Sequence, residues 1–500
     1  MIYAGDEIQE VKLGIDRSVP GRDATGLALC PGFMDMHSHS DLTLWVDPRG
    51  LSKISQGITT EVIGQCGTSG APLYGPMVGE VGRYFAHYGQ ELPYASMAAY
   101  LEGLDEKVSP NLVALIGHGT LRRGFLGEVD RQPTETELND MKNAVVQSMR
   151  EGAFGLSTGL IYPPGCYTET AELVSLSEAM APFGGIYFSH IRSEGDKLIE
   201  AVAETLYIGE VAGVAVQLSH HKAMGAPNWG KTETTLAMVT AAKEKGLDVS
   251  LDQYPYTASA TNLASLLPDW ALVGGKEEAL KRIQDPVLRA KMRYEIEEKE
   301  EAFGWSATRI SSVVDPVYSS WQGKTLEEVA ATLALAPIEA LFYVLEKTGL
   351  QVGMIRFGMD ETEVQKVLSY AHTLIGTDGG AVAPDGPLSM GMPHPRGYGT
   401  FPRILGHYVR EEALLSLPSA IARMTGMAAK RLRLHDRGFL KPGQKADLVL
   451  FDPNTVGDRA SFDAPHQFAV GIYGVYVNGE MVWQEGKYTG LTPGRALRRP

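Results

Sequence analysis

IYFSHIRSEGDKLIEAVAETLYIGEVAGVAVQLSHHK, residues 186–222, is the stretch that decides the fold. An apolar run ends in a polar cluster at His190, a segment with apolar residues at helical intervals follows, and a second apolar run ends at His220. A strand, a helix and another strand in this order are typical of a βαβ unit, whose two strands pair in parallel. The stretch therefore predicts one unit of a parallel α/β sheet.

The same alternation extends over residues 31 to 275. Further apolar runs with polar ends occur at GFMDMHSH (32–39), TTEVIGQCG (59–67), LVALIGHG (112–119), AFGLSTG (153–159) and DVSLDQYPY (248–256). TLIGTDGG (373–380) supplies an eighth candidate strand. Seven strands in series, joined by an eighth, favour a TIM-like (β/α)8 barrel over an open sheet.

The remaining segments show other sequence patterns. Residues 276–345 contain charged, helix-like sequence, which predicts an α-rich insertion. Residues 1–30 contain short strand-like runs, and residues 435–500 add more of them with a turn at VNGE (477–480). The C-terminal stretch is typical of a small β unit that closes the chain.

Composition excludes several classes of function. The 500 residues carry a formal net charge of −15 without a basic run, which argues against nucleic acid as a partner. No apolar stretch approaches 18 residues and the start does not resemble a signal peptide, so we expect a cytoplasmic protein with no membrane partner. Three cysteines are too few for a disulfide framework, and no phosphate-binding loop is present. Oligomeric state leaves no signal in the sequence.

Metal-ligand side chains stand at the ends of four predicted strands. His37 and His39 flank one residue, and because strand side chains alternate, both imidazoles project to the same side. Cys66, His190 and His220 end three further apolar runs. Thiolate and imidazole are zinc ligands, and three protein ligands with a water make an open, catalytic site.

Each cluster taken alone also fits a structural role. Cys66 could be a small buried thiol and His190 a hydrogen-bonded core histidine. Only one of the neighbours His220 and His221 can face the barrel axis, and we choose His220. His221 then has a supporting or structural role.

Polar groups suited to hydrolysis accompany these ligands. Asp378 precedes a Gly pair, where a carboxylate could take a proton from a zinc-activated water and deliver it to a leaving nitrogen; a plain turn residue is the alternative. Lys222, Tyr254 and Arg396 suggest a pocket for a substrate carboxylate, although each alone could be a solvated surface residue.

Taken in order, these motifs resemble the N-acyl-D-amino-acid deacylases, also called D-aminoacylases, of the amidohydrolase superfamily. The likeness runs from about Gly5 to ADLVLFDP (446–453). The stretches that carry it include PGFMDMHSHSD (31–41), GITTEVIGQCGTSGAP (57–72), GHGTLRRG (117–124), FSHIRSEGD (188–196), LSHHKAMG (218–225) and HPRGYGTFPRILG (394–406), and the likeness is specific through their order and number.

The resemblance implies a fold and an activity. It implies a TIM-like barrel at 31–434 with the insertion at 276–345, and a small β domain formed by 1–30 and 435–500. The implied enzyme is a metal-dependent amidohydrolase acting on linear amides, which converts an N-acyl-D-amino acid to a carboxylate and a free D-amino acid. The family usually carries about two dozen more residues at its start. We therefore expect either a reduced β domain or a true start upstream.

Site roles also follow from the resemblance. One tightly bound Zn²⁺ falls on Cys66, His190 and His220, and His37 and His39 line a second, weaker metal position. Asp378 matches the catalytic carboxylate. The contacts to the substrate carboxylate match Lys222, Tyr254 and Arg396.

Two other kinds of function compete with this one. A cyclic-amide hydrolase similar to dihydroorotase or hydantoinase, or a D-aminopeptidase or dipeptidase, would commonly hold two metals bridged by a carboxylated lysine. No lysine stands at a matching strand end, whereas Cys66 occupies a suitable place. Outside enzymes, the chain could be a metal-free barrel that serves as an interaction module. Retention of every ligand type argues against that alternative.

Overall fold

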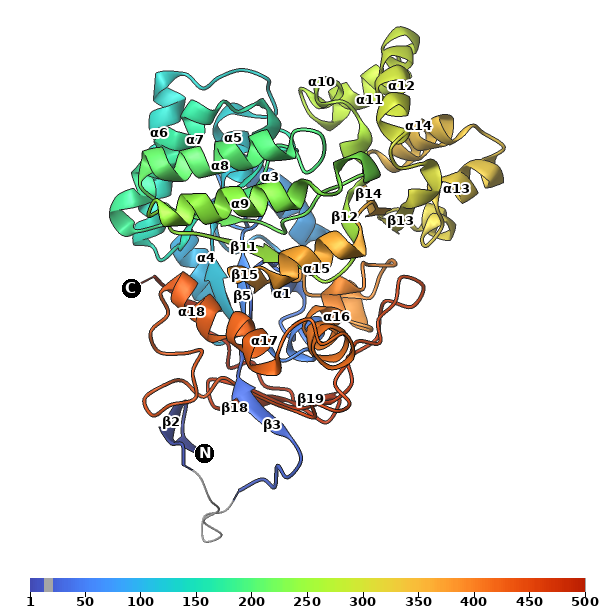
Figure 1. Ribbon diagram of the computed structural model, residues 1–500. Coiled ribbons are helices and arrows are strands. Elements are labelled where there is room, and N and C mark those ends of the chain that lie inside the picture. Colours follow the sequence, from blue (N-terminus) through green and yellow to red (C-terminus); the bar gives the residue numbers. More distant parts are fainter. Residues whose placement is uncertain (13–20, 500) are drawn as a thin grey trace.

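The computed structural model describes residues 1–12 and 21–499 (Figure 1). Part of the 1–30 segment, for which short strand-like runs were predicted, lies outside the described residues. Every one of the eight core strands predicted from the sequence is present, so the prediction of a parallel α/β protein is confirmed.

Two parallel sheets form the centre of the molecule. One has the strand order β15-β11-β10-β9-β8-β7, and the other has the order β20-β6-β5-β4. Their bounds are β4 (Phe33–Asp35), β5 (Ile58–Ile63), β6 (Asn111–Ala114), β7 (Ile116–Gly117), β8 (Gly155–Gly159), β9 (Ile186–His190), β10 (Ala215–Leu218), β11 (Val249–Gln253), β15 (Thr373–Ile375) and β20 (Ala496–Leu497). Most of these strands are buried along their whole length, as expected where helices cover a parallel sheet.

The two sheets meet on both sides. β6 and β7 are separated by Leu115 alone, whose N–H donates to the carbonyl of Ile63 at 3.0 Å. On the other side, the N–H of Met36 donates to the carbonyl of Ile375 at 3.0 Å, and Ser38 forms a parallel bridge with Gly379. These bonds join the end of β4 to the end of β15.

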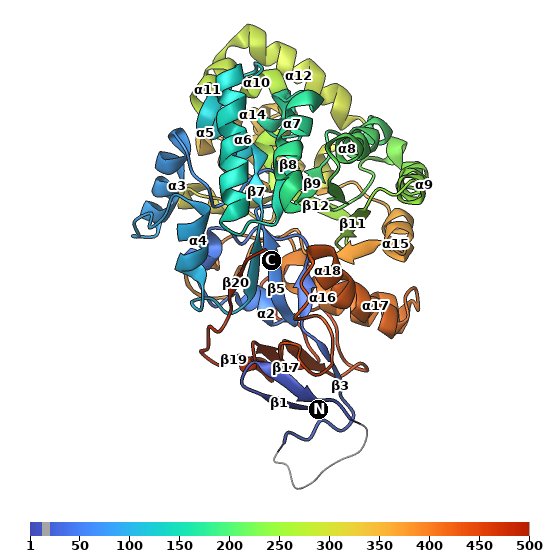
Figure 2. The same cartoon turned by 90° about the vertical axis from the view of Figure 1, so that its left-hand side faces the viewer.

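Helices surround these strands. Figure 2 shows α6 and α7 side by side outside β7 and β8, with α8 and α9 beyond β9. The bounds are α1 (Thr43–Val46), α2 (Leu51–Ile54), α3 (Pro76–His87), α4 (Met97–Leu104), α5 (His118–Leu126), α6 (Glu135–Arg150), α7 (Thr170–Met180), α8 (Leu198–Ala212), α9 (Lys231–Glu244), α15 (Glu361–Ser369), α16 (Arg396–Arg403), α17 (Leu417–Met424) and α18 (Gly426–Leu432).

A separate unit stands beside the parallel sheets, at the upper right of Figure 1. It has an antiparallel sheet in the order β12-β14-β13 and its own hydrophobic core, which runs from Leu263 to Met354. Its elements are β12 (Ala258–Asn262), α10 (Asp269–Leu272), α11 (Lys276–Gln284), α12 (Pro286–Glu300), β13 (Thr308–Val313), α13 (Leu326–Leu333), α14 (Pro337–Thr348) and β14 (Val352–Phe357).

Prolines divide the helical segments that the sequence pattern joins. The charged stretch from Lys276 is two helices, because Asp285 caps α12 and Pro286 occupies its first position. The following stretch breaks in the same way before Pro337, after Ala334 ends α13 with a φ of 55°.

Both ends of the chain contribute to one antiparallel sheet at the bottom of Figure 1. Its order is β19-β18-β17-β16-β3, and the predicted turn at VNGE joins β17 to β18 through Asn478 and Gly479, which both have positive φ. The bounds are β3 (Ala28–Pro31), β16 (Leu448–Phe451), β17 (Ile472–Val477), β18 (Glu480–Gln484) and β19 (Lys487–Tyr488), with β1 (Ile2–Ala4) and β2 (Glu7–Glu10) as a separate pair. Within the described ranges, no single helix is long and apolar enough to cross a membrane, although α13 and α14 pass that test as a pair bent by 88°.

Candidate active site

The carboxyl ends of the parallel strands converge on one cavity of about 1040 Å³. Cys66 follows β5, His190 ends β9, His220 follows β10 and Asp378 follows β15, and all four line this cavity. Strand ends at this edge are where the loops of a parallel α/β fold gather. Residues separated by more than three hundred positions are therefore brought together.

The tightest cluster joins thiol, imidazole and carboxylate. Cys66 Sγ lies 3.3 Å from His37 Nε2 and 3.3 Å from His220 Nε2. His37 Nε2 is also 3.5 Å from Asp378 Oδ1. These four residues offer ligand atoms that all lie within 4.8 Å of one another.

A second cluster shares His220 with the first. His190, Glu194 and His220 also offer ligand atoms within 4.8 Å of one another. His190 is buried, and neither ring nitrogen has a hydrogen-bond partner among the described residues. Buried polar atoms are normally paired, so the free nitrogens of His190, beside the Cys66 thiol and the Glu194 carboxylate, fit the donor set of a zinc ion.

Three residues of the site have strained backbones. Cys66 has a φ of 51°, His220 of 34° and Asp378 of 49°, all in the left-handed region that side chains other than glycine disfavour. Such conformations cost about 1–3 kcal/mol each and persist where surrounding contacts enforce them, commonly at functional sites. All three of these residues line the cavity.

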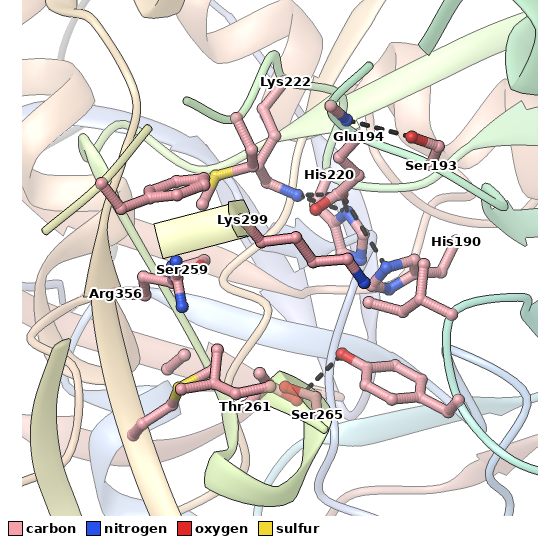
Figure 3. A pocket seen from close by; sticks show the side chains of 18 of the residues that line it. His190, Ser193, Glu194, His220, Lys222, Ser259, Thr261, Ser265, Lys299 and Arg356 are labelled. Atoms are coloured by element: carbon pink, nitrogen blue, oxygen red, sulfur yellow. Dashed lines mark hydrogen bonds and ion pairs between the residues drawn. The ribbon is translucent and has the colours of Figure 1, made fainter. Parts of the chain in front are cut away.

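The three residues predicted to bind a carboxylate lie beside these clusters. Lys222 Nζ is 2.8 Å from His220 Nδ1 and forms an ion pair with Glu194, as Figure 3 shows. The Tyr254 ring lies under both cations, 5.5 Å from Lys222 Nζ and 4.5 Å from the Arg396 guanidinium carbon. Arg396 Nη1 itself contacts Asp378 Oδ2 at 2.9 Å.

Charges in the cluster shift its proton affinities. Burial opposes ionisation of the Cys66 thiol, but His37, His220 and His190 outweigh it and hold its pKa well below the usual value. Burial likewise opposes ionisation of Asp378, yet Arg396 and the histidines hold the pKa of that carboxyl well below its ordinary range. Asp378 is therefore a carboxylate at neutral pH, and the Cys66 thiol ionises more readily than a free thiol.

Comparison with known proteins agrees with this geometry. The model of the amidohydrolase family matches residues 21–483. The chain belongs to the amidohydrolase family. This amidohydrolase is 38% identical to a D-aminoacylase of Alcaligenes xylosoxydans xylosoxydans, over 95% of this chain and 88% of the relative.

Solved structures give the same result. An N-acyl-D-glutamate deacylase from Bordetella bronchiseptica, complexed with zinc and a phosphonate inhibitor that mimics the tetrahedral intermediate, is 36% identical with a TM-score of 0.79, covering 95% of this chain and 90% of the other. A D-aminoacylase studied for its binuclear metal centre is 35% identical with a TM-score of 0.81, covering 99% and 94%.

The other two predicted histidines take different positions. His39 is half-buried, and its Nε2 lies 2.9 Å from Asp378 Oδ1. Burial lowers the pKa of His39, but the bond to Asp378 and the nearby Cys66 raise it to about 9. His221, unlike the adjacent His220, points away from the cluster, and its Nε2 lies 2.8 Å from the hydroxyl of Thr235 on α9.

Sequence reasoning missed two carboxylates that orient the imidazoles of this amidohydrolase. Asp252 Oδ1 lies 3.2 Å from His37 Nδ1 and accepts the backbone N–H of His220 at 2.7 Å. Glu194 Oε1 lies 3.0 Å from His220 Nδ1. Such partners fix the ring orientation of metal-binding histidines. The sequence offered one signal for each. Asp252 is an acidic residue near the end of a strand, and Glu194 stands four positions after His190.

The separate unit supplies one wall of the cavity. Figure 3 shows Ser259 and Thr261 on β12, Ser265 just after that strand, Lys299 on α12 and Arg356 on β14. The Thr261 hydroxyl donates to the Tyr162 hydroxyl at 2.9 Å, which joins this unit to the loop after β8. Periodicity identified helices here but not the cavity-facing side chains.

Proposed function

We propose that this amidohydrolase is a zinc-dependent N-acyl-D-amino-acid deacylase, which yields a carboxylate and a free D-amino acid. The observation that carries the proposal is one cavity holding both the thiol, imidazole and carboxylate cluster and a pocket of Lys222, Tyr254 and Arg396. Relatives matched over at least 95% of this chain are a D-aminoacylase and a deacylase that binds zinc and a mimic of the tetrahedral intermediate.

We assign the metal ligands as follows. Cys66, His190 and His220 hold the tight zinc, and His37 and His39 line a second, weaker position. The free ring nitrogens of His190 and the 3.3 Å contacts of Cys66 support this assignment. Zinc bound there supplies Lewis-acid polarisation of the acyl carbonyl and lowers the pKa of the attacking water.

Asp378 moves the proton. Its carboxylate is ionised, faces the cavity and is held by His39 and Arg396 at separate oxygens. It accepts a proton from the attacking water and returns the proton to the departing nitrogen as the amide bond breaks. Proton balance is complete without another residue.

The anion pocket holds the substrate by its free carboxylate. Arg396 presents a planar fork of donors, Lys222 a point charge, and Tyr254 a buried hydroxyl that has no partner within the described part of the chain. These groups hold the amide in a fixed position relative to Asp378, so that the energy of binding the carboxylate orients the reacting groups. The substrate class is therefore an N-acylated amino acid with a free carboxylate.

The architecture is proposed in the same terms. The bonds at Leu115, Met36 and Ser38 support one eight-stranded barrel within residues 31–434. The pairing of β3 with β16 supports a small β domain of residues 1–30 and 435–500. The core from Leu263 to Met354 supports an insertion that extends beyond 276–345 on both sides. Three free thiols support a reducing, cytoplasmic setting.

The alternatives are not favoured. A dihydropyrimidinase and D-hydantoinases share the fold with this chain at only 14% identity, so their likeness carries nothing about substrate. A metal-free interaction module does not explain why the buried ring nitrogens of His190 lack hydrogen-bond partners beside a thiol of lowered pKa.

A turnover screen tests the proposal. N-acetyl-D- and N-acetyl-L-forms of Met, Leu, Glu and Asp are assayed with and without added zinc. We expect zinc-dependent release of free amino acid from D-isomers only. Preference for L-isomers, or hydrolysis of cyclic amides alone, would contradict the assignment.

A further inference from the structure

The His-Ser-His-Ser run after β4 faces two ways. His37 and His39 turn toward the cavity cluster, whereas Ser38 and Ser40 turn to the opposite side. There the hydroxyl of Ser38 donates to Glu61 Oε2 at 2.5 Å, and that of Ser40 donates to the same oxygen at 2.6 Å. The His-Ser-His-Ser run therefore has a second, buried polar face that the catalytic proposal does not use.

A fully buried ammonium occupies this second face. Nζ of Lys53, on α2, lies within hydrogen-bond distance of four oxygens: Asp35 Oδ2 at 2.8 Å, Thr377 Oγ1 at 2.7 Å, the carbonyl of Gly379 at 2.6 Å and Ser38 Oγ at 3.1 Å. A buried charge is costly unless it is paired and fully hydrogen-bonded. The contacts to Asp35 and to three further oxygens satisfy that condition.

These partners flank the reacting groups in sequence. Asp35 and Ser38 enclose His37 on the end of β4, and Thr377 and Gly379 stand on either side of Asp378. Asp35 also accepts the N–H of Thr377 at 2.8 Å. Lys53 thus links the ends of β4 and β15 on the side opposite the cavity cluster, at the point where Asp378 adopts its left-handed φ.

We propose that Lys53 is a positioning residue for the deacylase reaction, which holds the strained backbone of Asp378 and the adjacent His37 so that the carboxylate faces the amide. The proposal rests on the deacylase function. Lys53 touches no substrate, because it is completely buried behind the strands. Its effect falls on the turnover step, since a displacement of about 1 Å at a catalytic group costs about 10²-fold in rate.

The test compares Lys53→Met with the unaltered holoenzyme. We expect kcat on an N-acetyl-D-amino acid to fall about 10²-fold, while KM stays within about threefold and bound zinc stays the same. Lys53→Arg, which restores a cation, recovers part of the loss. The matched control is Lys243→Met, which removes a lysine whose Nζ donates to the carbonyl of Val249 at the other end of β11, and its kcat is unchanged.

Two results would overturn the proposal. One is a kcat for zinc-loaded Lys53→Met within about threefold of the unaltered enzyme. The other is a fall in the activity of Lys53→Met that is fully accounted for by a matching fall in its bound zinc. If Lys53→Met does not fold, Thr377→Val decides, because it removes one hydroxyl bonded to Lys53 and Asp35. We expect about a tenfold lower kcat for it, and unchanged turnover overturns the proposal.

A crystal structure of Lys53→Met separates this proposal from the deacylase assignment, because it does not depend on turnover. We expect the Asp378 carboxylate to move by about 1 Å. An unmoved carboxylate overturns the role of Lys53 even if the enzyme is a deacylase. A moved carboxylate in a protein that hydrolyses no N-acyl-D-amino acid overturns the activity and leaves the positioning contact standing.

Discussion

Two buried clusters of this protein combine histidine with carboxylate, and they differ in what surrounds them. The cluster of Cys66, His220 and Asp378 has three left-handed backbones and opens into the large cavity. The other consists of His118 and Arg122 on α5 and Glu172 on α7, with His118 Nε2 2.8 Å from Glu172 Oε1. None of its members has a positive φ or lines the cavity.

The comparison shows that buried charge alone does not mark a catalytic site. In the second cluster, Arg122 pairs with Glu172 and donates to the carbonyl of Arg131 at 2.5 Å. These contacts link α5 to α7 and to the loop that follows α5. Strain and access distinguish the first cluster. We therefore expect substitutions in the first cluster to change turnover or metal binding, and those in the second to change stability.

The largest effect is expected at Asp378. Asp378→Asn removes the proton acceptor while keeping the shape, so kcat should fall by about 10²–10⁴-fold with zinc retained. Steady-state kinetics and elemental analysis on the same preparation measure both quantities. Near-normal turnover would remove Asp378 from its proton-transfer role.

A change at Cys66 should act on the metal. Cys66→Ser replaces a soft thiolate with a hydroxyl that is a poor zinc ligand. Zinc affinity should weaken by more than about 100-fold, since even supporting groups around a metal contribute about 10–100-fold. Competition with a chelator measures the affinity, and an unchanged value would exclude the thiol as a ligand.

Glu172→Gln should affect stability instead. It leaves Arg122 buried without its counter-charge, which typically costs about 3–5 kcal/mol in the free energy of unfolding. Urea unfolding measures the cost, and kcat per folded molecule should stay unchanged. A variant that is fully stable but inactive would reverse the contrast between the two clusters.

The same pair gives a smaller, pH-dependent effect. Burial opposes ionisation of Glu172, but His118 and Arg122 outweigh it and lower its pKa below the usual 4.5. A lowered pKa contributes stability that is complete above about pH 4.5 and is lost as the pH falls toward the folded-state value. The advantage of the unaltered protein over Glu172→Gln should therefore shrink below that pH. A difference independent of pH would show that Glu172 does not act through its charge.

Much of the fold was predictable because buried parallel strands are nearly continuous apolar runs. The runs around His190 and His220 identified β9 and β10 together with their polar ends. Helix boundaries in the separate unit were harder to predict from the sequence. The helix-like pattern of residues continues across Pro286 and Pro337, but a new helix begins at each of these prolines.

The candidate site was predictable only in part. Strand-end position identified the groups that face the cavity, because the carboxyl ends of parallel strands meet at one edge. Asp252 and Glu194 were missed because their role depends on which imidazole nitrogen each one reaches. Lys53 was also missed, since a lysine on a four-residue helix gives no sign in sequence that it is buried.

Zinc X-ray absorption on the purified protein tests the central claim most directly, because it reports which atoms surround the ion. The account predicts one sulfur scatterer near 2.3 Å together with nitrogen and oxygen ligands near 2.0 Å, and loss of the sulfur contribution in Cys66→Ser. A spectrum with nitrogen and oxygen ligands only would contradict it.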